Sequence, residues 1–396
     1  MSVWQPIGEP KLGEPTPAEL SLLAPTDAWP HVIGGIAGNG RAALALGYGR
    51  TTRFACELPD GPPVLRLLAL GDRVLAIRAP DGERRQCVEL IDADGKHQRT
   101  IEGLHGDWAL DVRASMLLGR TPDAELGAWS LPEPERRPIL VFNRLNGREL
   151  DALRFCDDTL VVVTRPEQRL GGPPPDVLVD VLRIPDYDDV SRWGSLRSRT
   201  RVAERIAEGL DRVVLGFDPA GLVLASGEEL WWGDWCLRER NRLEPGADVL
   251  PLQVAPRGDG SSWALVEREG RTELWHLAVG VCINAFVLDP ALVDGTLLIG
   301  PDESVVIASS SAVACHDAEG ALRWSFPRFG AATGLIDAHG VSVYSDRNML
   351  ISTDLLGDRA TVWTAPAGLG VKRLGPLAAT ATRMWVGAGR WVFGLA

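Results

Sequence analysis

The stretch SVVIASSSAVACHDAEGALRWSF, residues 304–326, contains three short β-strand patterns joined by tight turns. Residues 305–307 are apolar and β-branched, which favours a strand, and three serines follow as a small polar turn. Residues 312–316 form a second strand pattern. Asp317 to Gly320 supplies turn residues, and a third strand pattern ends near Trp324. This unit is typical of an antiparallel β-meander.

The same rhythm recurs along most of the chain, at spacings of roughly 37 to 44 residues with one near 60. Repeats of this length with four short strands are typical of β-propeller blades, which bury their faces only by stacking into a closed ring. We therefore predict an all-β fold, a β-propeller of about eight four-stranded blades. Seven blades is the alternative, because the unit over 107–155 is degenerate. Within that unit, residues 121–137 are predicted to be a loop. The C-terminal strands and a strand near 41–58 are expected to share one blade and close the ring.

Two regions depart from the repeat. Residues 1–30 are predicted to be an N-terminal extension with a short helix, because Thr16 to Glu19 resembles a capping box. Residues 31–396 then form a single propeller domain with an insert at 184–212. Val202, Ile206 and Leu210 lie four residues apart in that insert, which predicts a short helix. It is either an outer helix covering a blade or a partner-docking element, whose candidate residues are Arg192, Trp193, Arg197, Arg199 and Arg201.

Composition narrows the function classes. The 396 residues carry a formal net charge of −12, which argues against a general nucleic-acid binder because phosphate recognition needs a concentrated basic surface. The sequence contains neither a run of about 18 apolar residues nor a secretory signal pattern, so we expect a cytoplasmic protein without a membrane association. The six cysteines are widely spaced, which favours reduced, structural residues over a metal knuckle or a disulfide framework.

Several motifs suggest chemistry, but each has a simpler structural explanation. Cys315, His316 and Asp317 are consecutive in a strand, so their side chains alternate between faces and are not expected to converge. Asp92 to Gly95 imitates the start of a calcium loop but lacks the later acidic ligand, so we predict a β-turn. The prediction is therefore no catalytic, metal-binding or cofactor-binding residues. Trp231, Trp232 and Trp235 either pack within a blade or form an exposed interaction patch.

The segment VACHDAEGALRWSF resembles the quinoprotein-type (PQQ-like) propeller repeat, in which a strand leads to Asp, a turn Gly and a strand ending in Trp. CVELIDADGKHQRTI, residues 87–101, matches its Asp and Gly, and ILVFNRLNGREL only its turn. The repeats are degenerate and also WD-like. The resemblance implies that Trp324 and Trp363 pack between blades. Enzymes of that family hold a quinone with a vicinal cysteine pair, and this chain has no adjacent cysteines, so the dehydrogenase activity is not expected.

A second, weaker resemblance is to the β-propeller component of bacterial ternary systems with an AAA-type ATPase and a von Willebrand A-domain protein. It rests on the Arg-rich, degenerate repeats. The expected function is a non-catalytic protein-interaction scaffold, in which a rigid ring displays loops to partner proteins. The net charge favours basic surfaces on such partners. The alternative is a small-molecule binder, or an enzyme of hydrolase or lyase type, with its site at the central channel.

Overall fold

A computed structural model provides the structure of the chain. It describes residues 49–83, 85–111, 115–132, 137–142, 148–156, 159–166, 177–183, 201–207, 214–218, 221–225, 229–234, 236–244, 249–257, 261–278 and 280–396, with residues 4, 5, 28, 29, 42, 44 and 46. The helix expected at 16–23 lies outside these residues.

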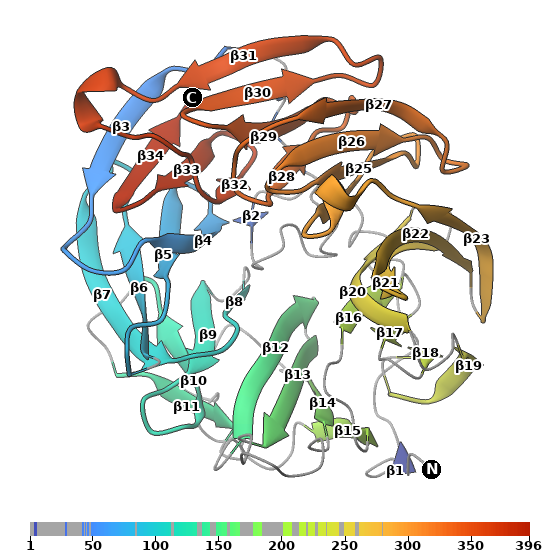
Figure 1. Ribbon diagram of the computed structural model, residues 1–396. Coiled ribbons are helices and arrows are strands. Elements are labelled where there is room, and N and C mark those ends of the chain that lie inside the picture. Colours follow the sequence, from blue (N-terminus) through green and yellow to red (C-terminus); the bar gives the residue numbers. More distant parts are fainter. Residues whose placement is uncertain are drawn as a thin grey trace.

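Eight four-stranded antiparallel blades form a ring (Figure 1). This arrangement confirms the predicted all-β propeller and decides for eight blades over seven. In each blade the first strand lies innermost and the last outermost. Blade 1 comprises β4 (Val64–Leu70), β5 (Arg73–Arg78), β6 (Arg85–Ile91) and β7 (His97–Leu104), and blade 2 comprises β8 (Ala109–Asp111), β9 (Met116–Arg120), β10 (Leu126–Ser130) and β11 (Ile139–Phe142). Blade 3 comprises β12 (Arg148–Cys156), β13 (Thr159–Pro166), β14 (Val177–Arg183) and β15 (Arg201–Ala207), and blade 4 comprises β16 (Val214–Asp218), β17 (Gly221–Ala225), β18 (Leu230–Gly233) and β19 (Glu239–Leu243).

Blade 5 comprises β20 (Val249–Pro256), β21 (Ser262–Arg268), β22 (Arg271–Ala278) and β23 (Val281–Val287), and blade 6 comprises β24 (Thr296–Ile299), β25 (Val305–Ala308), β26 (Ala312–His316) and β27 (Leu322–Pro327). Blade 7 comprises β28 (Gly334–Ile336), β29 (Ser342–Asp346), β30 (Met349–Thr353) and β31 (Arg359–Thr364), and blade 8 comprises β32 (Leu377–Ala379), β33 (Met384–Ala388), β34 (Trp391–Leu395) and β3 (Thr52–Glu57). Two-residue strands β1 (Trp4–Gln5) and β2 (Ala28–Trp29) pair with β15 and β4. The described helices are the short 3-10 turns η3 (Pro290–Leu292) and η4 (Ala367–Leu369).

Ring closure joins the two ends of the propeller. β3 pairs antiparallel with β34, so blade 8 combines three C-terminal strands with one strand from near the N-terminus. The predicted composite blade is thereby confirmed. β3 leads directly into β4 of blade 1, so its hydrogen bonds to β34 hold blade 8 beside blade 1 and close the ring.

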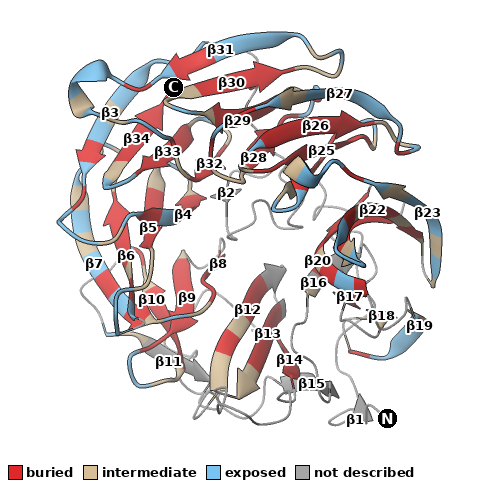
Figure 2. Cartoon of the chain, viewed as in Figure 1, coloured by how far each residue is buried: buried red, intermediate tan, exposed pale blue. Residues whose placement is uncertain are grey.

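Burial follows the layers of each blade (Figure 2). Every residue of β25 and β26 is buried, because blade 6 is covered on both faces by its neighbours. The outermost strand β7 instead alternates exposed positions with intermediate or buried ones. The core is therefore a series of apolar layers between blades. One such layer joins Val306 and Cys315 of blade 6 to Tyr344 of blade 7.

The tight turn before the outermost strand recurs with the same hydrogen bonds. In blade 6, Asp317 Oδ1 accepts from the backbone N–H groups of Glu319 (3.1 Å) and Ala321 (2.8 Å). Asp92 makes the equivalent bonds in blade 1, at 3.0 and 2.8 Å, as do Asp234 in blade 4 and Asp354 in blade 7. An aspartate that binds its own turn in this way directs its carboxylate to the backbone. The predicted β-turn at residues 92–95 is thus confirmed.

The aromatic residues of the repeat pack against the next blade. Trp324 of blade 6 approaches Gly357 in the turn of blade 7, where a Cβ would lie 3.2 Å from the indole. Trp363 of blade 7 packs on Phe393 of blade 8 at 5.1 Å between ring centroids, and its Nε1–H donates to Thr52 Oγ1 at 2.9 Å. The inter-blade packing expected of both tryptophans is confirmed. In this contact, the aromatic side chain of one blade packs on the turn glycine of the next blade, as Trp324 does on Gly357.

Gly95→Ala tests this contact, because Gly95 lies against Phe54 across the closure of the ring. Its φ of +80° disfavours a side chain, and an added Cβ would lie 2.2 Å from Cγ and 2.7 Å from Cβ of Phe54. Gly270→Ala is the matched control, since its φ is +72° and no atom lies within 4 Å. Chemical denaturation should show that Gly95→Ala loses about 1–3 kcal/mol more than Gly270→Ala. Equal losses of unfolding free energy in the two variants would mean that the positive φ alone, and not the contact with Phe54, requires a glycine at residue 95.

Two expectations about local structure are corrected. Residues 201–207 form β15, paired with β14, and not a helix. The spacing of four residues between Val202 and Ile206 fits the period of a strand as well as that of a helix. The structure also places strand β10 inside the stretch 121–137, which the sequence suggested was a loop. The other residues of the predicted insert, 184–200 and 208–212, lie outside the described residues.

Candidate functional site

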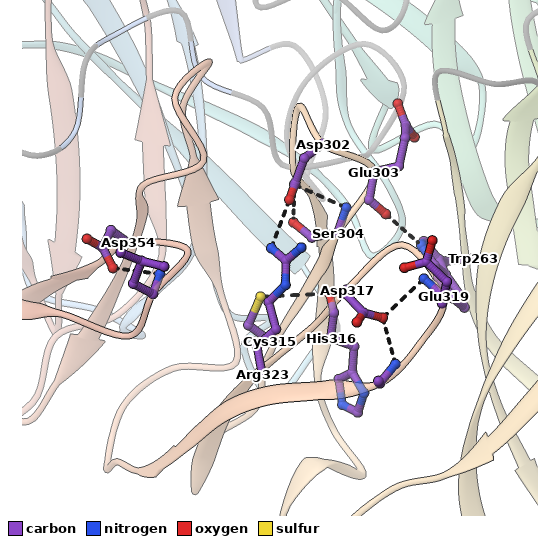
Figure 3. Close-up of polar contacts among 12 residues, drawn as sticks. Trp263, Asp302, Glu303, Ser304, Cys315, His316, Asp317, Glu319, Arg323 and Asp354 are labelled. Atoms are coloured by element: carbon purple, nitrogen blue, oxygen red, sulfur yellow. Dashed lines mark hydrogen bonds and ion pairs between the residues drawn. The ribbon is translucent and has the colours of Figure 1, made fainter.

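Cys315, His316 and Asp317 occupy the end of β26 and the following turn, and their side chains do not converge (Figure 3). Cys315 is fully buried in the apolar layer between blades 6 and 7. The His316 ring donates from Nδ1 to the Gly320 carbonyl oxygen at 3.0 Å, and burial lowers the pKa of His316. Asp317 binds its turn. The expectation that this motif is structural is confirmed.

Cys315 is predicted to be unreactive in the folded protein. Burial raises the pKa of its thiol to about 12, so almost no thiolate forms at neutral pH. Iodoacetamide labelling followed by mass spectrometry should modify Cys315 only after denaturation. Cys282, on the outermost strand β23 and partly exposed, is the control and should react first. Equal labelling rates of the two thiols would contradict the buried position of Cys315.

A carboxylate beside this motif is also structural. Asp302 Oδ1 accepts from the Ser304 hydroxyl at 2.5 Å, and Oδ2 accepts from Arg323 at 2.8 Å (Figure 3). Burial opposes ionisation of Asp302, but these hydrogen bonds outweigh it and lower its pKa below the ordinary value. The ionised group ties the β24–β25 turn to β27. A carboxylate held ionised in this way is poorly suited to act as a general acid.

A serine–histidine pair lies between blades 5 and 6, and no sequence pattern indicated it. Ser261 Oγ is 3.0 Å from His276 Nε2, but Arg257 Nη1 lies 2.5 Å from the same nitrogen. Because an arginine can only donate, His276 Nε2 accepts that bond, and the nitrogen that would deprotonate the serine is already engaged. Ser261 and Arg257 are 8% and 4% exposed. The arrangement is a buried polar cluster rather than an accessible nucleophile.

The neighbouring contacts of this cluster join the two blades. Arg257 Nε lies 3.5 Å from Glu303 Oε2 of blade 6, and Trp263 Nε1–H donates to the Glu303 carbonyl oxygen at 3.3 Å (Figure 3). The Arg257 guanidinium also lies 5.3 Å from the Trp263 ring. From the sequence, this cluster could have been predicted only from the pairing of β21 with β22, which places residue 263 opposite residue 276.

Charged residues also meet where the inner strands of blades 1 to 3 contact one another: Arg66 is on β4, Arg154 is on β12, and Asp107 comes just before β8. Asp107 forms ion pairs with Arg66 at 3.6 Å and with Arg154, and its two oxygens accept the N–H groups of Trp108 and Leu153. Asp107 is 5% exposed. Its carboxylate is thus fully engaged in holding three inner strands together, which leaves it no role as a catalytic base.

The predicted partner-binding residues are only partly covered by the structure. Trp231 and Trp232 are 0% and 1% exposed, so of the two alternatives these residues pack within blade 4 and do not form an exposed interaction patch. Neighbouring blades cover both faces of β18, which buries side chains on either side of the strand. Arg201 begins β15, and no more is described of it. Arg192, Trp193, Arg197, Arg199 and Trp235 lie outside the described residues.

Metal ligands and membrane spans are both missing from the described part of the chain. Within it, no three His, Cys, Asp or Glu side chains are grouped so that they could hold a metal ion. None of the described helices is long and apolar enough to cross a membrane.

Comparison with known proteins gives a fold likeness alone. No protein-family model matches the chain, and no curated protein matches its sequence. Among solved structures, Hsv2 from Kluyvelomyces marxianus is 12% identical with a TM-score of 0.51, over 77% of this chain and 99% of that one. Virginiamycin B lyase from Staphylococcus aureus is 9% identical with a TM-score of 0.44, over 87% and 98%. The Cps50 (Swd1) β-propeller domain from Myceliophteria thermophila is 9% identical with a TM-score of 0.43, over 85% and 98%. The likeness to Hsv2 is one of fold alone.

Proposed function

We propose that this protein is a non-catalytic, cytoplasmic interaction scaffold, which displays the loops of a rigid β-propeller to partner proteins. The observation that carries the proposal is ring closure through the pairing of β3 with β34. A closed ring holds the loops of both faces at fixed positions, so partners can dock without an ordering cost in the scaffold. Exposed apolar side chains on such loops, including Phe329 at 61% and Leu356 at 86%, support this use.

We further propose that the scaffold belongs to a bacterial multi-protein system, with an AAA-type ATPase and a von Willebrand A-domain protein as partners. The degenerate, Arg-rich repeats support this finer assignment. The alternative of a channel enzyme or small-molecule binder would need available polar groups on the inner strands. The complete engagement of Asp107 favours the scaffold over that alternative.

Affinity capture of the tagged full-length chain from its native host, with cross-linking and mass spectrometry, tests the proposal. The expected result is one or more stoichiometric partners, cross-linked to loops of the propeller. Genes for the two named partners beside this gene would support the finer assignment. A stable monomer without any stoichiometric partner would contradict the scaffold function.

A further inference from the structure

The face of the ring that carries the connections between blades holds a basic pocket. Antiparallel strands place these connections on the same face as the loops between second and third strands. On this face, residues 369–373, which begin with the last residue of η4, and residues 388–391, at the β33–β34 turn and the strand ends beside it, enclose a hollow of about 240 Å³. Its lining includes Lys372, Arg373 and Arg390 and no acidic side chain. We name these nine residues the connector pocket.

Of the three basic side chains of the connector pocket, only Arg390 forms ion pairs with carboxylates among the residues that the structure describes. Arg390 forms ion pairs with Glu57 and with Asp60, the latter at 2.8 Å. Arg373 instead donates to the Gly330 carbonyl oxygen. Lys372 is exposed and forms no ion pair with any residue that the structure describes. The pocket is therefore cationic at Lys372 and Arg373, on a chain whose overall charge is −12.

An exposed aromatic side chain adjoins the pocket. The Arg373 guanidinium lies 5.2 Å from the Phe329 ring, and that ring is 61% exposed. The Phe329 carbonyl oxygen accepts from Arg347 N–H at 2.6 Å, which brings a further exposed arginine to the same patch. Arginine and aromatic residues together are the side chains that contribute most at protein interfaces.

A buried arginine, Arg328, lies next to Phe329 in the sequence and close to Arg373. Arg328 is 5% exposed and donates to the backbone carbonyl oxygens of Ser309 and Ala331. Burial lowers the pKa of Arg328 to about 10, and the nearby Arg373 acts in the same direction. Asp294 and Asp346 lie near Arg328 and partly offset its charge, so Lys372 and Arg373 supply the positive charge that is exposed at this site.

We propose that the connector pocket and Phe329 bind an acidic peptide segment of a partner protein. The proposal rests on the scaffold function and names its binding face. The hollow is smaller than the roughly 300–1,000 Å³ of small-molecule sites, so it suits one side chain of a longer segment. A guanidinium pairs with a carboxylate through two parallel hydrogen bonds, and Lys372 adds a point charge. Glu57 and Asp60 neutralise Arg390, which leaves two unneutralised cations on a chain with a net charge of −12; this suits a short acidic segment better than a long polyanion such as nucleic acid.

Selection from a phage library of random linear peptides on the full-length chain tests the proposal without requiring an identified partner. Selected peptides should be rich in Asp and Glu next to an apolar residue. A synthetic peptide of the selected sequence should bind Lys372→Glu/Arg373→Glu at least about tenfold more weakly than the native chain, a loss of about 1.4 kcal/mol. Phe329→Ala should also weaken binding.

Arg268→Glu/Arg271→Glu is the matched control. It makes the same change of charge at exposed positions around the β21–β22 turn, on the same face but outside the pocket. Binding to this variant should stay near the native value. Selected peptides without acidic residues, an absence of selected peptides, or equal losses in both variants would overturn the proposal. So would loss of binding to phosphatidylserine vesicles or single-stranded DNA in the pocket variant, with no peptide selected. If affinity capture still recovers a partner with the pocket variant, the scaffold function stands and the connector pocket is not its site.

Discussion

Arg78→Ala is expected to lower the free energy of unfolding by about 3–5 kcal/mol, because it leaves a buried carboxylate without its cation. Arg78 and Glu89 lie on neighbouring strands β5 and β6, with 2.7 Å between Nε and Oε1, and each side chain is 3% exposed. Arg78 also donates to the carbonyl oxygens of Pro62 at 2.9 Å and Pro59 at 2.5 Å. These carbonyls belong to the connection between blade 8 and blade 1, so the arginine secures the ring where it closes.

The rest of the network explains why the loss should be large. Glu89 Oε2 accepts from Thr100 Oγ1 at 2.7 Å and lies 2.8 Å from His97 Nε2. Those contacts remain in Arg78→Ala, but neither replaces a buried guanidinium. The double variant Arg78→Met/Glu89→Met removes both charges and should recover much of the lost stability.

Denaturation by guanidinium chloride gives the comparison, with Arg85→Ala as the control. Arg85 pairs with Glu83 at 3.2 Å, but their side chains are 57% and 71% exposed, so this pair should contribute less than about 1 kcal/mol. A loss for Arg78→Ala no greater than that of Arg85→Ala would show that the connection is secured by other contacts.

The repeat could be predicted from the sequence because the residues that define each blade are close to one another in the sequence. Turn residues such as Asp317 and Gly320, and alternating strands on either side, do not depend on distant contacts. The composite blade was predictable for the same reason, since three strand patterns at the end of the chain lack a fourth. Residues 201–207 were mistaken for a helix because a spacing of four residues fits both periodicities, and only the pairing with β14 decides between them.

The polar sites could not be predicted, because their members are brought together by blade packing. Asp107 and Arg154 are 47 residues apart in sequence and belong to different blades. The connector pocket likewise combines the segment after η4 with a turn of blade 8. Trp231 and Trp232 show the converse. Adjacent strand residues point to opposite faces, but both faces of this strand are covered, so alternation did not expose either.

Cys56→Pro is expected to open the ring. The bond from Leu58 N–H to the Arg390 carbonyl oxygen, 2.9 Å, fixes which residues of β3 donate to β34. Donors alternate along an antiparallel strand, so Cys56 also faces β34 while Ala55 faces away. A proline at Cys56 removes a donor in the middle of the closing pair. The expected loss is about 3 kcal/mol or more, with faster hydrogen exchange along β34.

Two variants separate this effect from side-chain changes. Ala55→Pro places the same ring one residue away, where the N–H faces solvent at the sheet edge, and such positions tolerate proline. Cys56→Ala removes only the buried thiol. If closure through β3 stabilises the whole propeller, Cys56→Pro should lower the melting temperature well below either control and release exchange protection in β34 first. Equal behaviour of the two proline variants would mean that side-chain packing of β3, rather than its hydrogen bonds, keeps the ring closed. Loss of protection confined to blade 8, without a change in melting temperature, would show that the other seven blades hold their stacked arrangement without the closing strand.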